Sequence, residues 1–567
     1  MLPWELYMKR LRIGPYEIAA FAIIACSVIL RLILTVYNWP SLGSDDGTMG
    51  LEAIHIAFRG EHPIFFYGQN YMGVIEAYLG AVFFRLFGIS VFSMRLGMIL
   101  IFTLFLIAMY CLASLLYNKK LAIVTLFVLS FGWELILHSE LAPVGGVVET
   151  LLFGTLSFLL AFWLARTASQ IQRQQHPWKR LAAYWSWGLV VGLGIWSHVL
   201  VIPFVLASGF ILLIFCWREW RTLAIPCIIV GLVVGGFPLI VYNLTAPPSQ
   251  NSLAVILSIQ GGNDPGAGVS VGPSGFVKHL VTTFLIVLPS AAGFPVCNLN
   301  VMPIFGHIGP KTLSCSITQG AWSLGYMALL LISMTMALVP LRILLNEYRL
   351  NREAWSEEQR QLSVLHFTRL MLVFGGLLSI TIYLHSTYAA AQPNTSRYLV
   401  GLLIVLPGVI WPLLNSIGHL SPTAGLNILW MTFRYSLLLF AIVFVQCGTI
   451  AIIPTLPGAQ AKAAADQKLL HDLEQRDITR FYSDYWTCNR LTFLSKEQTI
   501  CSDVNPDLTT AEVNRIPSYE VIIASDPKAA YVFPVGFFTE SADHNPRIMK
   551  HYHRFMVDGY VVYEPSS

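Results

Sequence analysis

Ser44-Asp45-Asp46-Gly47-Thr48-Met49-Gly50-Leu51-Glu52 closely follows the first apolar segment of the chain, Pro15–Tyr37. That segment is long enough to cross a bilayer as a helix. Asp45 and Asp46 are therefore expected at the membrane–water boundary, where a carboxylate stays ionised and still reaches a lipid headgroup. Ionisable groups at membrane depth are costly, so such a pair favours a functional role. The alternative is an acidic, solvated loop without a function of its own.

The residues after this aspartate pair predict two helices that lie along the membrane surface. Glu52–Gly60 has apolar residues at helical spacing and ends in a glycine suited to a helix C-terminus. The aromatic stretch His62–Gly73 separates it from the apolar segment Val74–Phe87. Aromatic rings at headgroup level are typical of such surface helices. We expect residues 39–95 to form the floor of a site, with these substrate-binding candidates: Glu52, His62, Tyr67, Gln69 and Tyr71.

The composition indicates an α-helical polytopic membrane protein. Of 567 residues, 55% are hydrophobic and 12% are charged, which excludes an ordinary soluble protein and a disordered one. About eleven segments of about 20 residues each predict membrane crossings. Besides Pro15–Tyr37 they are Leu96–Tyr117, Leu121–Leu137, Val144–Ala165, Leu181–Ser197, Val199–Phe215, Leu223–Tyr242, Ala321–Leu341, Leu370–Leu384, Leu399–Leu414 and Ile428–Ile453.

The distribution of basic residues predicts the orientation in a plasma or inner membrane. Lys9, Arg10 and Arg12 precede the first span, so the N-terminus is expected in the cytoplasm. If Val74–Phe87 stays on the external face, the later basic clusters also fall on the cytoplasmic side, and if it crosses they turn outward. The positive-inside rule thus favours the surface-lying arrangement. The clusters are Lys119, Lys120, Arg166, Arg173, Lys179, Arg180, Arg218, Arg221, Arg342, Arg349, Arg352 and Arg360.

An odd number of crossings places the C-terminus outside, and the composition changes after Pro454. Residues 1–454 are expected to form the membrane domain and residues 455–567 a small external α/β domain. Ala461–Arg480 has helical spacing, whereas three later runs have the pattern of strands. These runs are residues 519–524, 530–533 and 559–563.

The long external connection 243–320 is low in charge and typical of a lid or a disordered segment. Its apolar part, Leu280–Phe294, predicts a surface-lying or re-entrant helix. If it crossed the membrane instead, the C-terminal domain would be cytoplasmic. Lys278 is the binding candidate in this connection.

Further candidates come from three other external connections. His138 and Glu140 lie between two predicted spans and are either site residues or solvated loop residues. His198 lies at a hinge, where a structural role competes with ligand binding. Arg397 and Tyr398 open a late span, where an arginine is placed to bind an anionic headgroup or to extend to the interface.

Four of the nine cysteines form two local pairs in segments expected outside. Cys297 with Cys315 and Cys488 with Cys501 are expected to form disulfides in an oxidising compartment, and four free thiols are the alternative.

Taken together, these motifs resemble the GT-C membrane glycosyltransferases, specifically the protein-O-mannosyltransferase and aminoarabinose-transferase group of glycosyltransferase family 39. The resemblance covers nearly the whole chain in layout but only residues 44–97 and 395–400 as motif. It rests on the aspartate pair, the surface helix with its aromatic segment, the acidic second loop and the external C-terminal domain, together with Arg85-Leu86-Phe87-Gly88, Arg95-Leu96 and Arg397-Tyr398-Leu399.

The resemblance implies transfer of a sugar from a polyprenyl-phosphate carrier to an acceptor at the external membrane face. It assigns the base to Asp45, with Asp46 beside it, and the second-loop acid to Glu140. Arg397 would lie near the donor phosphate. The chain departs from the family in having Asp-Asp rather than Asp-Glu, Thr48-Met49 in place of a tyrosine or arginine, and His62 and His198 nearest to where a lysine is often found.

Physical chemistry supports the same assignment. Phosphate is a competent leaving group, so the enzyme mainly needs a base and positive charge. Arg397, Lys278 or His198 would stabilise the phosphate, and direct attack inverts the anomeric centre. No cofactor is required, although two adjacent carboxylates with Glu140 make a divalent metal possible. Membrane lipids are expected partners and nucleic acid is not. The rival functions are transport of a lipid or sugar-lipid and a non-catalytic scaffold subunit.

Overall fold

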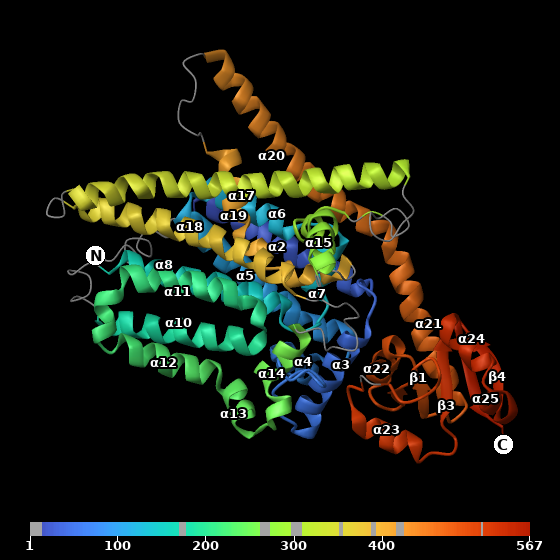
Figure 1. Cartoon of the computed structure of the whole chain (residues 1–567). Coiled ribbons are helices and arrows are strands. Elements are labelled where there is room, and N and C mark those ends of the chain that lie inside the picture. The colour runs from blue at the N-terminus through green and yellow to red at the C-terminus, as the bar shows by residue number, and fades with distance from the viewer. Residues whose placement is uncertain are drawn as a thin grey trace. The chain divides into compact units, whose positions relative to one another are not determined.

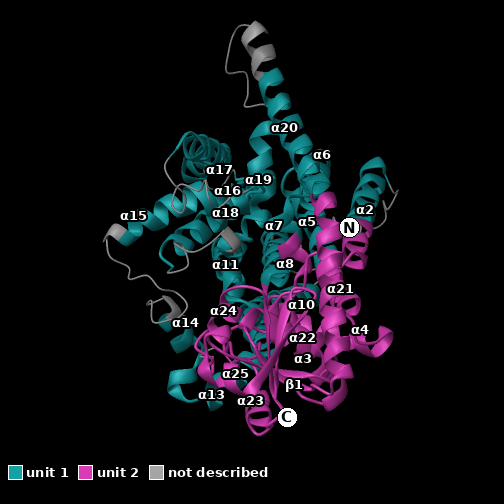
Figure 2. Cartoon of the chain, turned by 90° about the vertical axis from the view of Figure 1, so that its right-hand side faces the viewer, with its two compact units in different colours: residues 1–28, 101–137, 147–451 teal, residues 29–100, 138–146, 452–567 magenta. Residues whose placement is uncertain are grey.

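The structure is a computed structural model, and it describes residues 14–168, 177–260, 273–295, 297, 309–350, 355–386, 393–415, 424–511 and 514–566. The expected cytoplasmic residues Lys9, Arg10, Arg12, Arg173 and Arg352 lie outside the described residues. The chain folds into two compact units, which are coloured separately in Figure 2. Unit 1 contains residues 1–28, 101–137 and 147–451. Unit 2 contains residues 29–100, 138–146 and 452–567.

Unit 1 is helical throughout the residues that the structure describes (Figure 1). Helices α2 (Pro15–Val36) and α5 (Val91–Leu116) are among those with residues in both units. The remaining α-helices of unit 1 are α6 (Lys119–Ser130), α8 (Val147–Arg166), α10 (Pro177–Ser197), α11 (Ile202–Phe215), α12 (Ala224–Gly235), α13 (Phe237–Thr245), α14 (Ser252–Gln260), α15 (Pro273–Thr282), α16 (Leu288–Ala291), α17 (Pro310–Leu350), α18 (Glu357–Leu384), α19 (Leu402–Leu414) and α20 (Ala424–Ile452).

Among the described residues, six helical segments are long and apolar enough to cross a membrane, or up to eight if two bent pairs each count as one span. The expected count of about eleven is therefore not confirmed. The predicted span Leu121–Leu137 bends by 85° between α6 and α7 (Glu134–Leu141), and Leu223–Tyr242 bends by 70° between α12 and α13. Three further apolar helices are only 10–17 residues long: Val199–Phe215, Gly275–Ala291 and Leu402–Leu414.

Both bends occur where backbone groups leave the helix or where glycine and proline lie close together. At the first bend the N–H of Gly132 donates to Thr449 Oγ1 at 3.0 Å, which satisfies a backbone donor that leaves the helix. The second bend falls at Gly236, next to Pro238 in the first turn of α13. Glycine and proline in apolar helices are tolerated where neighbouring groups satisfy the freed backbone.

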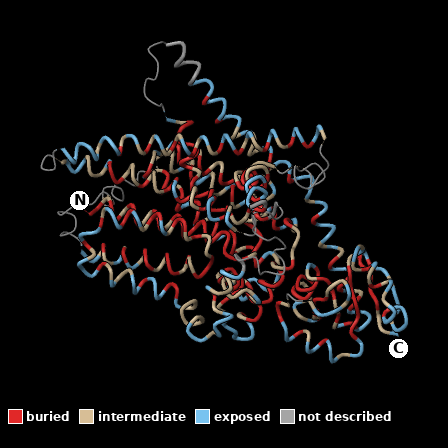
Figure 3. Tube along the Cα trace, viewed as in Figure 1, coloured by how far each residue is buried: buried red, intermediate tan, exposed pale blue. Residues whose placement is uncertain are grey.

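Glycines set the closest helix packing in unit 1. A Cβ on Gly188 of α10 would lie 2.2 Å from the carbonyl oxygen of Ile228, and one on Gly192 would lie 2.5 Å from that of Leu232. Small residues at such crossings let two backbones approach. The helix α8 is buried along most of its length (Figure 3).

Unit 2 combines helices from the first half of the chain with an α/β sheet from its end. The early helices are α3 (Ser44–Ile54), the π-helical turn η1 (His55–Arg59) and α4 (Ile75–Phe87). The late elements are α21 (Leu456–Gln475), β1 (Arg480–Ser483), α22 (Tyr485–Leu494), β2 (Ile500–Asp503), α23 (Pro517–Ala524), β3 (Ala530–Pro534), α24 (Phe537–Asp543), α25 (Pro546–His551), β4 (Tyr552–Val557) and β5 (Tyr560–Pro565).

The sheet has the strand order β2-β1-β3-β5-β4. Strand β1 pairs in parallel with β2 and β3, whereas β5 pairs antiparallel with β3 and β4. The carboxyl ends of β1 and β2 therefore lie at one edge, where Ser483 is opposite Asp503. A disulfide, Cys488–Cys501, joins α22 to β2, and a second one, Cys297–Cys315, joins residue 297 to α17.

The C-terminal region has two of the three strands that its sequence predicts. Residues 530–533 and 559–563 correspond to β3 and β5, but residues 519–524 belong to helix α23, so the strand prediction there was wrong. A strand would place Tyr519, Val521 and Ile523 on one face. Instead Tyr519 and Ile523 are buried while Val521 is 72% exposed. Pro517 in the first turn starts this helix.

Two further expectations shift in position. The helix predicted over Ala461–Arg480 runs from Leu456 to Gln475, and Arg480 opens β1. The aspartate pair, expected in a loop, lies in the first turn of α3, and the connection with His138 and Glu140 contains the short helix α7. Gly60 ends the first surface helix in the left-handed conformation (φ 71°), as predicted.

One apolar core joins α3 and α4 to the C-terminal helices α22 and α23. Met49, Leu51 and Phe84 from the early helices pack with Phe493 and Ile523 from the late ones. Segments separated by about 400 residues thus form one compact body, and the division of the chain near residue 454 remains a prediction.

Candidate functional site

The helix α3 begins at the aspartate pair for a local reason. Gly43 precedes it with an extended backbone, and its N–H donates to Asp46 Oδ2 at 2.8 Å. This is one half of a reciprocal capping arrangement. Carboxylates in a first turn also interact favourably with the partial positive charge of a helix N-terminus. The sequence Gly-Ser-Asp-Asp thereby fixes where the helix starts and how each aspartate is oriented.

Helix α22 lies directly beside α3 (Figure 1) because α3 presents two glycines to it. A Cβ on Gly47 would lie 2.6 Å from the backbone of Asn489 and Arg490, and one on Gly50 would lie 2.6 Å from the ring of Phe493. Contacts this short leave no room for a larger residue. The close approach positions the start of α22 beside the aspartate pair.

Asp45 is held by two side chains from the end of the chain. The hydroxyl of Tyr485 donates to Asp45 Oδ1 at 2.6 Å, and Arg515 Nη2 lies 3.4 Å from the same oxygen. The Asp45 side chain is 20% exposed. Its other oxygen, Oδ2, has no hydrogen-bond partner among the residues that the structure describes. One carboxylate oxygen is thus anchored, and the other is available to a ligand.

Arg515 is itself fixed in place. It is buried, and its Nε and Nη2 donate to the Tyr485 hydroxyl at 3.2 and 2.9 Å. Its Nη1 donates to the carbonyl of Tyr67 at 3.3 Å, and its guanidinium lies 5.0 Å from the centre of the Phe66 ring. Arg515 therefore links the aromatic segment of the first loop to Asp45.

Asp46 has a different environment. It is 3% exposed, and apart from the Gly43 N–H its carboxylate faces the buried guanidinium of Arg95. Arg95 in turn donates to the carbonyls of Trp39 at 3.0 Å and Pro40 at 2.5 Å. Burial raises the pKa of Asp46 to about 6, although the charge of Arg95 opposes the shift. Asp46 holds the helix start rather than facing an open surface.

Glu52 is fully buried one and a half turns further along α3. Its Oε1 accepts the N–H of Tyr67 at 2.5 Å, and its Oε2 has no partner among the described residues. Burial raises the pKa of Glu52 well above its usual value. The Tyr67 hydroxyl contacts Glu61 at 2.9 Å and His55 Nδ1 at 2.8 Å. Glu52 and Tyr67 are thus brought together and stabilise the loop.

The other first-loop candidates differ from Glu52 in burial. His62 is exposed, whereas Gln69 and Tyr71 are half-buried. The N–H of Gln69 donates to the carbonyl of Phe66 at 2.8 Å, which closes the turn that carries Tyr67.

Glu140 is not an open acid. It forms a buried ion pair with Arg31 of α2, a residue that the sequence did not single out for the site. Its neighbour His138 is half-buried. Only Oε2 contacts Arg31, and Oε1 has no hydrogen-bond partner among the described residues.

Glu76 was also missed by sequence reasoning. Its carboxylate is buried and accepts the N–H groups of Gly145 and Gly146 at 3.0 and 3.1 Å. Both glycines have positive φ, and a Cβ on Gly145 would lie 2.2 Å from Met72 Sδ. An acidic residue within the predicted surface helix Val74–Phe87, followed much later by Gly-Gly, gives no sequence signal of this contact.

Four predicted binding residues belong to unit 1. His198 is buried and accepts the N–H of Leu200 through Nδ1 at 3.2 Å, which caps the following turn. Lys278 is exposed on α15. Arg397 and Tyr398 lie together in the 3-10 helix η8 (Pro393–Leu399), where the guanidinium is 5.3 Å from the centre of the Tyr398 ring. Residues 387–392 before them are outside the described chain.

A second acidic group lies at the carboxyl edge of the sheet. Asp484 Oδ1 caps α22 through the N–H of Trp486 at 2.9 Å. Asp503 is buried, and neither of its oxygens has a partner among the described residues. Burial, together with the charge of Asp484, raises the pKa of Asp503 to about 7.

The predicted metal ligands are not gathered. Asp45, Asp46 and Glu140 do not form a group of metal-binding atoms within 4.8 Å of one another among the described residues. One such group does occur there, Cys488, Cys501 and Asp503, but its two sulfurs form a disulfide and so cannot be thiolate ligands. These three residues are therefore not confirmed as a common set of metal ligands.

Comparison with solved structures identifies the fold. ArnT from Cupriavidus metallidurans, bound to undecaprenyl phosphate, is 11% identical, with a TM-score of 0.52 over 96% of this chain and 98% of that one. The same protein in its apo state is 12% identical, with a TM-score of 0.40 over 96% and 97%. The oligosaccharyltransferase AglB from Archaeoglobus fulgidus, in complex with an inhibitory peptide and a dolichol-phosphate, is 14% identical, with a TM-score of 0.45 over 97% and 74%.

No family model and no curated protein matches the chain by sequence. At such low identity the likeness to ArnT concerns the fold, and it extends over nearly the full length of both chains. With the apolar helices and the small C-terminal sheet, it confirms the predicted fold class. The chain is an integral membrane protein with the GT-C fold of membrane glycosyltransferases.

Proposed function

We propose that this protein transfers a sugar from a polyprenyl-phosphate donor to a hydroxyl acceptor, with Asp45 as the general base. The observation that carries the proposal is the asymmetric anchoring of Asp45. Oδ1 contacts Tyr485 and Arg515, whereas Oδ2 has no partner among the described residues on a side chain that is 20% exposed. A base must be oriented and yet accessible to the proton it removes.

The fold supports the donor class. ArnT has this fold and was crystallised with undecaprenyl phosphate, an isoprenoid phosphate. Because the polyprenyl carrier leaves as a phosphate, it does not need to be protonated by an acid of the protein. The demands on the protein are therefore a base for the acceptor and positive charge near the phosphate.

The reaction follows from these parts. Asp45 Oδ2 takes the proton from the acceptor hydroxyl, whose oxygen then bonds to the anomeric carbon. The bond between that carbon and the phosphate oxygen breaks, and its electron pair stays with polyprenyl phosphate. Because attack and departure occur on opposite faces of the sugar, the anomeric configuration inverts.

The other predicted residues take supporting roles. Tyr485 and Arg515 are positioning residues that hold Asp45 through its Oδ1. Asp46 fixes the start of α3. Arg397 and Lys278 are the proposed contacts for the donor phosphate, with Tyr398 stacked on Arg397. Following the basic-residue pattern, we place this site on the external face, with the N-terminus in the cytoplasm.

Purified protein in lipid nanodiscs, incubated with a panel of labelled polyprenyl-phosphate sugars and lipid or glycan acceptors, tests the proposal. Consumption of one donor with an inverted product is expected. Asp45→Asn should abolish it, whereas Asp507→Asn, which changes an exposed carboxylate of the same unit, should not. Movement of labelled lipid across the bilayer without sugar transfer would favour a transporter. Donor consumption that is unchanged in Asp45→Asn would reject Asp45 as the base.

A further inference from the structure

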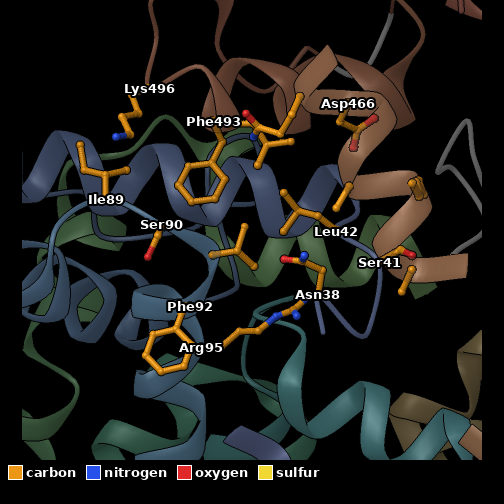
Figure 4. Close-up of a pocket in the computed structure, with 16 residues that line it drawn as sticks. Asn38, Ser41, Leu42, Ile89, Ser90, Phe92, Arg95, Asp466, Phe493 and Lys496 are labelled. Carbon is orange, nitrogen blue, oxygen red and sulfur yellow. The ribbon is translucent and has the colours of Figure 1, made fainter. Parts of the chain in front are cut away.

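A cavity of about 490 Å³ lies in unit 2, with Arg95 among the residues that line it (Figure 4). Its walls come from the segment after α2, from the connection between α4 and α5, from α21 and from the end of α22. The lining residues are Asn38, Ser41, Leu42, Ile89, Ser90, Val91, Phe92, Arg95, Ala459, Lys462, Ala463, Asp466, Gln467, Phe493, Leu494 and Lys496. A volume of this size suits a small-molecule headgroup.

The charge of this cavity is positive. Three cationic side chains line it, Arg95, Lys462 and Lys496, against one acid, Asp466. Asp466 is already satisfied, because its Oδ1 accepts the hydroxyl of Tyr560 at 2.6 Å and its Oδ2 lies 3.4 Å from Arg490 Nε. Because Arg95 faces the Asp46 carboxylate, Lys462 and Lys496 are the lining cations that a ligand can contact.

The two lysines supply that charge in an available form. Neither the Lys462 nor the Lys496 ammonium makes a hydrogen bond or an ion pair with a residue that the structure describes, and both residues are exposed. Arg95, in contrast, donates to two backbone carbonyls. An ammonium with three donors is a common binder of phosphate oxygens.

The cavity lies where two apolar helices end. Both α2 and α5 are long and apolar enough to cross a membrane, and the cavity is lined by residues just after α2 and at the start of α5. Its wall is also partly apolar, with Leu42, Val91 and Phe92 among the lining residues. On the adjoining end of α4, Leu86 and Phe87 are each 66% exposed. Positive charge beside apolar surface at this level matches a lipid rather than a soluble metabolite.

We propose that this cavity binds an anionic glycerophospholipid, with its phosphodiester between Lys462 and Lys496 and its acyl chains along Phe92 and Val91. The lipid is separate from the sugar donor, and the proposal does not depend on glycosyl transfer. Its bound headgroup would tie α21 to the end of α22 and so stabilise unit 2.

Delipidated full-length protein in a neutral detergent provides the test. Phosphatidylglycerol should raise Tm more than phosphatidylcholine, and native mass spectrometry should detect retained phosphatidylglycerol. The double variant Lys462→Gln/Lys496→Gln should bind it roughly tenfold more weakly, because two phosphate contacts are lost. The matched control, Lys528→Gln/Lys550→Gln, removes two exposed lysines of the same unit away from the cavity and should behave as wild type.

Three further measurements separate binding of this lipid from misfolding, from binding of free phosphate and from binding of the sugar donor. Lys462→Arg keeps the charge and should keep the preference for phosphatidylglycerol, even if the double variant folds poorly. Equal stabilisation by phosphatidylcholine, or by inorganic phosphate alone, would overturn the proposal. So would a dependence on the two lysines that is seen only with polyprenyl phosphate, because the cavity would then belong to the donor.

Discussion

The N-terminus of α3 carries two consecutive aspartates, Asp45 and Asp46, whose surroundings differ. Asp45 is partly exposed and contacts Tyr485 and Arg515, whereas Asp46 is buried beside Arg95 and accepts the Gly43 N–H. Consecutive residues of a helix point about 100° apart. An aspartate pair is therefore not one functional unit, since each carboxylate faces a different part of the molecule.

The largest expected effect is the difference in transfer rate between the Asp45→Asn and Asp46→Asn variants. Asp45→Asn should lower the rate of sugar transfer by about 10² to 10⁴-fold, the usual contribution of a general base. Asp46→Asn keeps an oxygen acceptor for the Gly43 N–H. Its transfer rate should therefore stay at least about tenfold above that of Asp45→Asn. Initial rates at saturating donor measure both, with size-exclusion profiles as the folding control. Equal losses would show that the two sides of α3 do not differ in function.

Removal of the contacts to Asp45 should give the next largest effect. Arg515→Gln should lower the transfer rate by up to about 10²-fold, because a base displaced by about 1 Å loses that much. Tyr485→Phe removes one hydrogen bond and should cost less. Arg480→Gln changes an arginine of the same unit whose partner is Asp526, so it serves as the control. A positioning role for Arg515 should lower kcat with little change in KM, and a rise in KM alone would assign Arg515 to substrate binding instead.

The packing of α3 on α22 can be broken without touching either aspartate. Gly47→Ala adds a Cβ 2.6 Å from the α22 backbone and should destabilise the protein by about 1–3 kcal/mol, the usual cost of overpacking. A Cβ on Gly458 of α21 meets no atom within 4 Å, so Gly458→Ala should be neutral or stabilising. Thermal unfolding in detergent compares the two. A Gly47→Ala protein as stable as wild type would contradict the close approach of these helices.

The smallest expected effect is on the pH dependence of stability, and it tests whether Asp46 titrates in the folded protein. Its folded-state pKa is raised to about 6, so the folded state binds this proton more tightly than the unfolded state does. The wild type should therefore lose stability from this group as pH rises from about 4 to about 6. Asp46→Asn lacks the titration, so its Tm relative to wild type should rise over that range. A Tm difference that is independent of pH would show that Asp46 does not titrate there.

The sequence predicted the fold class because apolar length and helix signals are local. The start of the first surface helix and the break at Gly132 were missed, since they depend on Gly43, Asp46 and a distant threonine, Thr449. The 519–524 error has a similar origin. A short run rich in Val and Ile suits a strand or a half-buried helix, and the packing of Tyr519 and Ile523 decides between them.

The sequence predicted Asp45 of the candidate site but not the residues that hold it. Asp45 could be found from its place after an apolar span, but Tyr485 and Arg515 lie about 440 and 470 residues away in sequence. Nothing in their local pattern marks them. Tyr485 reaches Asp45 because α22 packs on Gly47 and Gly50, and Arg515 reaches it through Tyr485 and the carbonyl of Tyr67. Similarly, Glu140 gave an acidic signal, but its ion pair with Arg31 is a tertiary contact.

A structure of the protein with a non-transferable polyprenyl-phosphate sugar analogue would show whether Asp45 faces the reacting atoms. If Asp45 is the working carboxylate, its Oδ2 should lie within hydrogen-bonding distance of the acceptor position, while Asp46 stays bonded to Gly43. An analogue whose anomeric carbon lies out of reach of Asp45, or beside Asp46, would contradict the account.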